Sequence, residues 1–230
     1  MQKGIDSKYW IIRLYTDRTE MERILLLSCA FSIFLWFVRF VVTGSLMHGF
    51  LIWNLFLAYL PYSIARNLEK RLSAIKSRLS FLLIFICWLL FIPNTFYIIT
   101  DLFHLDEGTA APMWYDLALI FSFAWNGIIL GVLSLYKMER IISRRFNYKV
   151  TFLFVYSIML LNSIGIYIGR YLRFNSWDVI TDPFQLANDV SYLCFHPIRN
   201  GMEWAMIFCF SILMTFMYLV LKKTKDAVTE

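Results

Sequence analysis

Residues 79–99 read LSFLLIFICWLLFIPNTFYII, and no side chain in this stretch carries a formal charge. A helix of about 20 apolar residues matches a hydrocarbon layer roughly 30 Å thick and satisfies its backbone hydrogen bonds within itself. Five further apolar stretches of this kind flank it, at residues 24–43, 46–64, 113–136, 150–171 and 204–221. The sequence therefore predicts an all-α bundle of six transmembrane helices.

The composition supports a membrane protein. Of the 230 residues, 60% are hydrophobic and 19% are aromatic, which is more apolar surface than a soluble domain of this size can bury. Residues 1–22 are too charged to form the apolar core of a signal peptide, so we expect the first helix to remain as an anchor. The predicted organisation is an N-terminal segment over 1–22, one membrane domain over 23–221 and a tail over 222–230.

Basic residues cluster on one side of the predicted bundle. Short loops rich in Lys and Arg stay in the cytoplasm, so we predict a plasma-membrane protein with both termini cytoplasmic. The net charge of +6 then reflects topology and contact with an anionic leaflet of the lipid bilayer. No nucleic-acid motif is present. The clusters are Lys3, Lys8, Arg13, Arg18 and Arg23; Arg66, Lys70, Arg71, Lys76 and Arg78; Lys137, Arg140, Arg144, Arg145 and Lys149; and Lys222, Lys223 and Lys225.

The opposite, outer face holds an unusual concentration of charged residues. The remaining basic residues and all the histidines fall there, together with half of the carboxylates. These residues are Arg39, Arg170, Arg173 and Arg199; His48, His104 and His196; and Asp101, Asp106, Glu107, Asp116, Asp178, Asp182, Asp189 and Glu203. Ionisable residues at membrane depth usually have a function, which makes this face the candidate site.

Asn94, Tyr97, Asp101 and His104 form one stripe along the end of the third predicted helix. Their spacings of three, four and three residues match the helical period. Pro93 should kink the helix and free a carbonyl near Leu89, which Asn94 or Thr95 can help to satisfy. The alternative is an ordinary helix end, with an interfacial tyrosine and a solvated Asp–His pair.

Asp116 lies at the start of the fourth predicted helix, at the same depth as Asp101 and His104. We predict that these three residues act as acid–base groups or as ligands of a divalent metal, since carboxylate and imidazole suit both roles. The alternative for Asp116 alone is a favourable interaction with the helix dipole.

Arg170 and Arg173 project from neighbouring positions at the end of the fifth predicted helix. Two guanidinium groups suit a phosphate or carboxylate, so we predict that they bind an anionic substrate. Asn94, Tyr97, Asn175 and Asp178 are further candidate substrate contacts. The alternative is a structural salt-bridge network or contact with lipid phosphates.

Two smaller patterns bear on the packing. Asp182 and Pro183 open a short amphipathic helix that we expect on the outer surface, with Phe184, Ala187, Val190 and Leu193 or Cys194 as its apolar stripe. Gly127 and Gly131, like Gly165 and Gly169, are four residues apart, which favours close packing of the fourth and fifth predicted helices.

Four blocks of the sequence resemble an uncharacterised bacterial and archaeal membrane family, domain of unknown function 1361. They are residues 91–105, 114–117, 122–127 and 165–178, in the family's order. The resemblance implies a prokaryotic multi-pass membrane protein and no known activity. The extended charged segment before Arg23 is less typical of this family.

Three functions follow from these patterns. The leading one is a site, open to the outside, that binds or processes an anionic substrate that is part of the envelope or linked to lipid. The second is a small transporter subunit, in which Asn54, Asn126 and Asn162 near the helix centres mark a polar route. The third is an accessory protein with a structural polar network and an unidentified protein partner.

Overall fold

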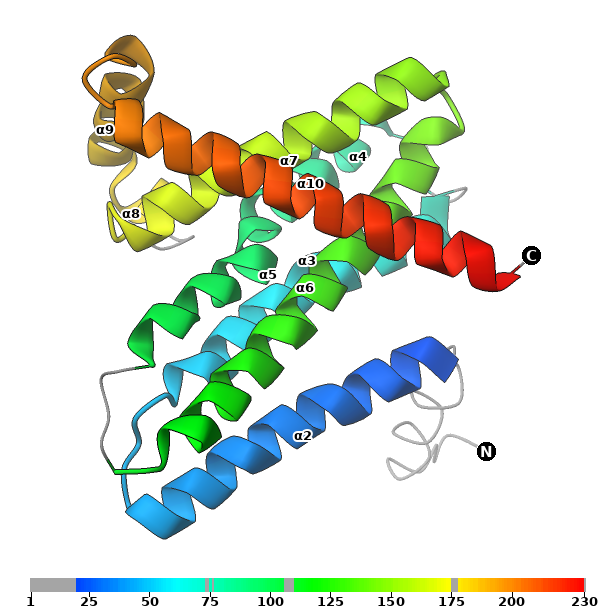
Figure 1. Ribbon diagram of the computed structural model, residues 1–230. Coiled ribbons are helices and arrows are strands. Elements are labelled where there is room, and N and C mark those ends of the chain that lie inside the picture. Colours follow the sequence, from blue (N-terminus) through cyan, green and yellow to red (C-terminus); the bar gives the residue numbers. More distant parts are fainter. Residues whose placement is uncertain (1–19, 73–74, 76, 106–109, 175–177, 230) are drawn as a thin grey trace, which may run out of the picture.

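The computed structural model describes residues 20–72, 75, 77–105, 110–174 and 178–229, and every regular element in them is a helix (Figure 1). The predicted N-terminal segment, up to residue 19, and the candidate Asn175 lie outside the described residues. The helices are α2 (Glu20–Thr43), α3 (Phe50–Arg71), α4 (Arg78–Phe91), α5 (Pro93–Tyr97), η2 (Ile98–His104), α6 (Met113–Ser143), α7 (Tyr148–Arg170), α8 (Asp178–Thr181), α9 (Pro183–Phe195) and α10 (Gly201–Thr229).

Among the described residues, five helical segments are long and apolar enough to cross a membrane: Glu20–Thr43, Arg78–His104, Met113–Ser143, Tyr148–Arg170 and Gly201–Thr224. The sixth predicted span corresponds to α3, which is not among them. This helix carries Asn54, Glu69 and several basic residues. Part of its apolar surface faces inward, with Leu51, Ala58 and Ala65 fully buried, whereas Trp53 and Phe56 are exposed. The all-α membrane fold is thus confirmed, and five of its six predicted spans have the length and composition required.

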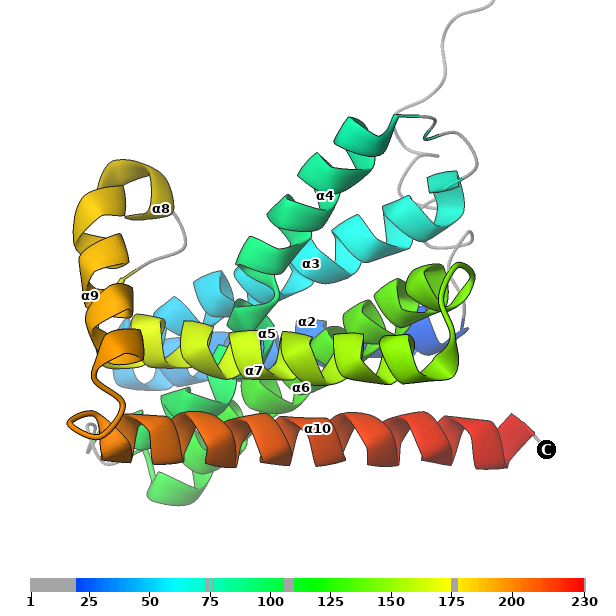
Figure 2. The ribbon, with the colours of Figure 1, turned by 90° about the horizontal axis from the view of Figure 1, so that it is seen from above.

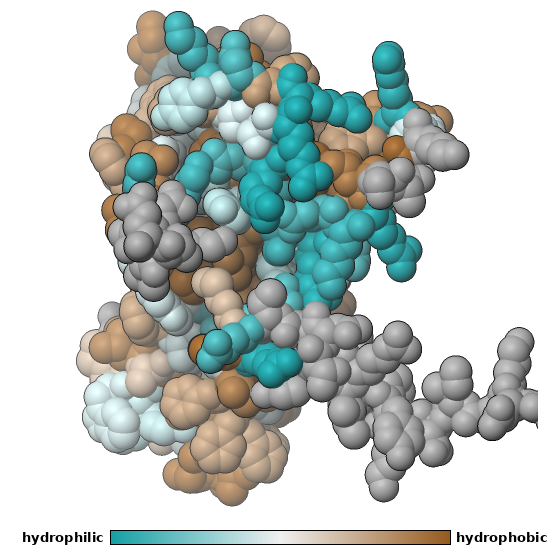
Figure 3. Space-filling view, turned by 90° about the vertical axis from the view of Figure 1, so that its right-hand side faces the viewer, coloured by the Kyte–Doolittle hydropathy of each residue, from teal (hydrophilic) through white to brown (hydrophobic). Residues whose placement is uncertain are grey.

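The bundle has two ends of different character. We call one the pocket end, where α2, η2 and α7 finish and α3, α6 and α10 begin, and the other the basic end (Figure 1). Hydrophilic side chains gather on the basic end, which faces the viewer in Figure 3. Ion pairs there join neighbouring helices: Glu22 with Arg66, Glu69 with Lys137 and Glu139 with Lys222, at 2.9, 3.1 and 2.7 Å.

Pro93 divides the third predicted span. Proline has no N–H to donate, and α4 accordingly ends at Phe91 while α5 starts at Pro93. The side-chain amide of Asn94 donates to the carbonyl of Phe91 at 3.0 Å, and the hydroxyl of Thr95 donates to that of Ile92 at 2.7 Å. The kink and the two helping side chains are as predicted, but the carbonyls that they bind are those of Phe91 and Ile92 rather than Leu89.

The glycine pairs of α6 and α7 face α5 and η2. A Cβ atom on Gly131 would lie 2.5 Å from the Thr95 hydroxyl, and one on Gly165 would lie 2.7 Å from Pro93. Gly127 similarly approaches the Thr95 carbonyl, and Gly169 approaches the Tyr97 ring. The helices α6 and α7 contact each other, as predicted, but the glycines do not lie in that contact: they allow α5 to lie close to both helices.

The short helix predicted after the fifth span is α9. Asp182 caps it by accepting a hydrogen bond from the backbone N–H of Gln185 at 3.4 Å, and Pro183 occupies its first turn. Of the predicted apolar stripe, Leu193 is buried, whereas Phe184 is 89% exposed. In Figure 2, α8 and α9 stand beside the pocket end of α7.

Candidate functional site

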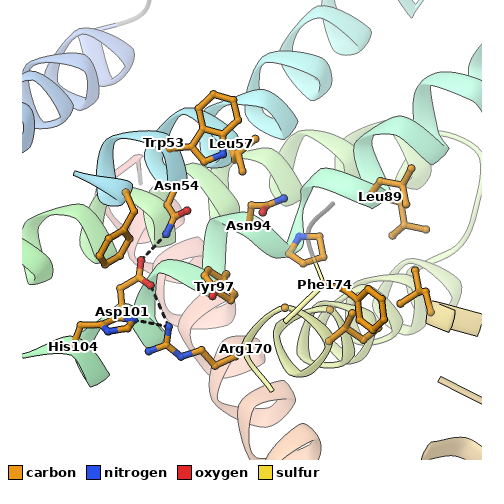
Figure 4. Close-up of a pocket in the computed structure, with 17 residues that line it drawn as sticks. Trp53, Asn54, Leu57, Leu89, Asn94, Tyr97, Asp101, His104, Arg170 and Phe174 are labelled. Carbon is orange, nitrogen blue, oxygen red and sulfur yellow. Dashed lines mark hydrogen bonds and ion pairs between the residues drawn. The ribbon is translucent and has the colours of Figure 1, made fainter. Parts of the chain in front are cut away.

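A cavity of about 500 Å³ lies between α3, the α4–α5–η2 segment and α7, toward the pocket end (Figure 4). The turn after α7 and helix α9 complete its wall through Phe174 and Leu186. This volume is in the range of small-molecule sites in proteins. The cavity is therefore large enough for an organic ligand.

All four residues of the predicted stripe line this cavity: Asn94, Tyr97, Asp101 and His104. The segment changes from α-helix to 3₁₀-helix at Ile98, yet the side chains stay on one face. Spacings of three and four residues return to the same face at either helical pitch. The prediction that these four side chains share one face is confirmed, and that face lines the cavity.

Polar groups from three elements meet at one end of the cavity. The amide of Asn54 on α3 donates to Oδ2 of Asp101 at 2.9 Å. Nη1 of Arg170 on α7 lies 3.7 Å from Oδ1 of the same carboxylate and 2.9 Å from Nε2 of His104. We call Asn54, Asp101, His104 and Arg170 the open cluster, because all four line the cavity (Figure 4).

The contact between Arg170 and His104 fixes the role of the histidine ring. A guanidinium nitrogen only donates hydrogen bonds, so Nε2 of His104 is the acceptor and the ring hydrogen lies on Nδ1. Both described polar contacts of the guanidinium use Nη1. Within the described chain, Nε and Nη2 of Arg170 remain as donors for a ligand.

Asp116 lies in a second group of charges and outside the cavity wall. Its carboxylate accepts two hydrogen bonds from Arg39 on α2, at 2.6 Å from Nε and 3.1 Å from Nη2. Nε2 of His48 lies 3.7 Å from Asp116 Oδ2. All three side chains are almost completely buried. We call Arg39, His48 and Asp116 the closed cluster.

The two clusters are neighbours. The Phe50 ring lies between them, with its centroid 6.1 Å from that of His48 and 5.3 Å from that of His104. His48 has a positive φ of 63°, which turns its side chain inward from the loop between α2 and α3. Burial and the neighbouring Arg39 guanidinium lower the pKa of His48 below its usual value of 6.5.

The metal prediction joined Asp101, His104 and Asp116. In the described residues, no group of three or more His, Cys, Asp or Glu side chains is placed to hold a metal ion. Asp116 is engaged by Arg39, and the lone pair of His104 Nε2 faces a guanidinium. These residues do not fit a shared metal centre.

The other residues predicted to bind the anion or the substrate do not lie together in the structure. Arg170 lines the cavity, whereas Arg173 is exposed and does not contribute to its wall. Arg173 has a φ of 61° in the turn that ends α7, where the N–H of Phe174 donates back to the carbonyl of Ile168 at 3.2 Å. Arg173 thus belongs to the turn that ends α7. Asp178 begins α8, and its Oδ1 accepts a hydrogen bond from Thr181.

Sequence reasoning missed several residues of the two clusters. Asn54 was treated as a midplane amide, although it is near the start of α3 and binds Asp101. Arg39 was noted at the outer depth, but no partner was assigned to it. An arginine within an apolar helix and an aspartate at equal depth on another helix are the signal that could have paired Arg39 with Asp116.

Comparison with known proteins identifies the family. The family model described as a protein of unknown function (DUF1361) matches residues 53–220. No curated protein and no solved structure gave a match. The match spans most of the chain, from α3 through α10, and includes the whole cavity wall except Phe50. The chain belongs to the DUF1361 family.

Proposed function

We propose that this membrane protein binds an anionic substrate, part of the envelope or linked to lipid, in the cavity at its pocket end. The observation that carries the proposal is the open cluster, in which Asn54, Asp101, His104 and Arg170 converge from α3, η2 and α7 on one cavity. Polar groups placed at such depth are costly unless they are satisfied or used. Arg170 supplies the positive charge that attracts the anion.

The chemistry of the cluster divides between binding and proton transfer. The N–H groups of Arg170 that have no partner among the described residues suit the oxygens of a phosphate or carboxylate. Asp101 and His104 lie within reach of the same guanidinium, so a ligand bound there has a carboxylate and an imidazole beside it. These are the side chains most often used for general acid–base chemistry, and they form the catalytic part of the proposal.

The transporter alternative has less support. The core that follows the cavity toward the basic end is closely packed, with Trp88, Leu135 and Met138 fully buried. Asn126 on α6 donates to Ser32 on α2 at 2.9 Å, so its amide links two helices. Asn162 contacts Met159 of its own helix. These contacts support a structural role for the midplane amides.

The proposed orientation places the pocket end outside the cell and the basic end in the cytoplasm, with α3 as the sixth span. Cys194 on α9 is exposed at the pocket end. A membrane-impermeant maleimide should label it in intact cells. A Cys194→Ser variant carrying Arg144→Cys at the basic end should be labelled only after lysis, and labelling of intact cells would reverse the orientation.

Anion binding is tested with soluble probes on the purified protein. Inorganic phosphate and glycerol 3-phosphate are added to the wild type, to Arg170→Gln and to Arg144→Gln, which removes an exposed guanidinium at the basic end. A ligand at ten times its Kd stabilises the folded state by about 1.4 kcal/mol, which is measurable as a rise in Tm. We expect this rise in the wild type and in Arg144→Gln, and its loss in Arg170→Gln. Equal behaviour of all three proteins would refute the anion site.

The acid–base part is tested in cells. A growth or envelope defect caused by deletion should be complemented by the wild type and by Arg144→Gln. Asp101→Asn and His104→Gln, which keep the size of the side chains, should fail to complement it when expressed at equal level in the membrane. Full complementation by both variants would remove the catalytic assignment and leave anion binding to be judged by the Tm assay.

A further inference from the structure

The cavity has two chemically different ends. Asn54, Asp101, His104 and Arg170 gather on one side, while Leu89 and Phe174 lie on the side away from Asp101 and His104 (Figure 4). Leu57, Leu90 and Ile168 add further apolar surface to the wall. A small inorganic anion would contact the polar side and leave most of the 500 Å³ without a partner. The shape and polarity suit a ligand with an anionic head and an apolar body.

The rim of the cavity indicates the direction from which such a ligand arrives. Trp53 on α3 and Leu90 on α4 line the cavity, yet they are 51% and 41% exposed. Leu90 belongs to a segment that is long and apolar enough to span the membrane, so its exposed surface faces hydrocarbon. Large apolar side chains that border a cavity at this depth place its opening toward lipid.

The inner wall differs from the rim. Leu57, one turn beyond Trp53 on α3, is 8% exposed and still lines the cavity. A lipid in the ring around the protein can touch Trp53 without entering. Contact with Leu57 requires the chain to pass between α3 and the α4–α5 segment. Leu57 is therefore a position that distinguishes a lipid inside the cavity from one outside it.

From these observations we infer that the ligand is an anionic lipid that enters the cavity sideways from the bilayer. Its phosphate-bearing head binds Arg170, and its hydrocarbon chain lies beside Leu57 and Leu89. This inference rests on the proposed function and narrows its substrate to a lipid. A soluble anion shares the head-group chemistry but does not account for the apolar half of the cavity or for its exposed apolar rim.

The test uses phosphatidylglycerol with a photoreactive diazirine in its acyl chain, in nanodiscs of phosphatidylcholine that contain the purified full chain. After illumination, peptide mass spectrometry locates the lipid adducts. We expect adducts at Leu57 and Leu89 in the wild type. In Arg170→Gln, these adducts should fall about tenfold, the change expected when one charge-assisted contact is lost. Arg170→Lys, which keeps the charge, should retain part of the signal.

Three controls separate entry of the lipid into the cavity from contact at the protein surface. Adducts at Phe31 and Phe34 on α2, which are 54% and 58% exposed, report lipid around the protein and the integrity of the fold, and they should be equal in all variants. Arg144→Gln should match the wild type. Phosphatidylcholine carrying the same diazirine should label α2 but give at least about tenfold fewer adducts at Leu57, because its head has no net negative charge.

The outcomes distinguish the inference from the proposed function. Adducts at Leu57 and Leu89 that do not depend on Arg170, that form equally with phosphatidylcholine, or that are absent would each overturn the anionic-lipid inference. If phosphate still raises the Tm through Arg170 in those cases, the anion site stands and its ligand comes from the aqueous side. If the Tm response is also absent, both proposals fail.

Discussion

The open and closed clusters are neighbours with similar side chains, an arginine, an aspartate and a histidine in each. In the closed cluster, Arg39 and Asp116 form a two-point contact with 0% and 1% of their side chains exposed. In the open cluster, the closest approach of Arg170 to Asp101 is 3.7 Å, and 15% of the arginine side chain and 1% of the aspartate side chain are exposed. The two clusters thus differ in how closely the arginine approaches the aspartate and in how exposed the arginine is.

The two arginines differ in which of their nitrogens are already engaged by protein groups. Arg39 directs Nε and Nη2 at one carboxylate, an arrangement that fixes α2 against α6. Arg170 contacts Asp101 and His104 through a single nitrogen and borders a cavity. We interpret the closed cluster as structural and the open cluster as available to a ligand, and the following predictions test that division.

The largest expected effect is on stability, from breaking the closed cluster. Arg39→Met leaves the Asp116 carboxylate buried without its counter-charge, which should lower the free energy of unfolding by about 3 to 5 kcal/mol. SDS titration of the purified protein in mixed micelles measures this change. The double variant Arg39→Met with Asp116→Leu removes both charges and should recover most of the loss. A single variant as stable as the wild type would show that the pair is not structural.

A smaller loss should follow from filling the contact beneath the open cluster. Gly165→Ala places a Cβ 2.7 Å from Pro93, and such overpacking costs about 1 to 3 kcal/mol because the helices must move apart. The same titration reports it. Gly201→Ala is the control, because nothing lies within 4 Å of a Cβ at that position. Equal stability of the two variants would mean that α5 is not held as closely as the geometry indicates.

The variant Arg170→Gln should separate stability from ligand binding most clearly. Asp101 keeps the hydrogen bond from Asn54 once the guanidinium is gone, and the contact that is lost is a 3.7 Å ion pair to a partly exposed arginine. The loss of stability should therefore stay below about 1 kcal/mol. Its effect on anion binding should be large, as proposed above. A loss as great as that of Arg39→Met would assign the open cluster a structural role as well.

The smallest effect is a pH dependence from His48. Its pKa is lowered in the folded protein, so the unfolded chain binds the proton more readily and stability is lost as the pH falls through 6.5. At pH 6.5 the loss attributable to this proton should be below about 0.5 kcal/mol, and it should grow toward pH 5.5. Stability measured from pH 7.5 to 5.5 should fall less in His48→Gln. A steeper fall in that variant would contradict the assignment.

Sequence periodicity predicted the helices and the shared face of four side chains that line the cavity. The length of the apolar stretches predicted where the helices lie. The spacing of Asn94, Tyr97, Asp101 and His104 predicted that their side chains share one face, which lines the cavity. Asp182 and Pro183 marked the start of α9, because capping chemistry is local. These successes share a cause: each depends on residues within a few turns of one another.

The errors concern which helices meet. Depth along the membrane normal placed Asp116 beside Asp101, but the partner of Asp116 is Arg39, because α2 packs beside α6 at that height. The spacing of Gly165 and Gly169 predicted a close approach to the fourth predicted helix, α6, whereas these glycines approach α5. Which helices are neighbours in the bundle depends on tertiary packing, and no local pattern in a single sequence predicts it.

The separation of Arg39 and Asp116 along the chain has a consequence for biosynthesis. Asp116 follows Arg39 by 77 residues, so at about 5 to 20 residues per second the ribosome needs about 4 to 15 s to supply the counter-charge. During this interval Arg39 lacks the Asp116 carboxylate. We therefore expect α6 to help retain α2 in the bilayer, and a chain truncated before Met113 should release α2 more readily than the complete protein.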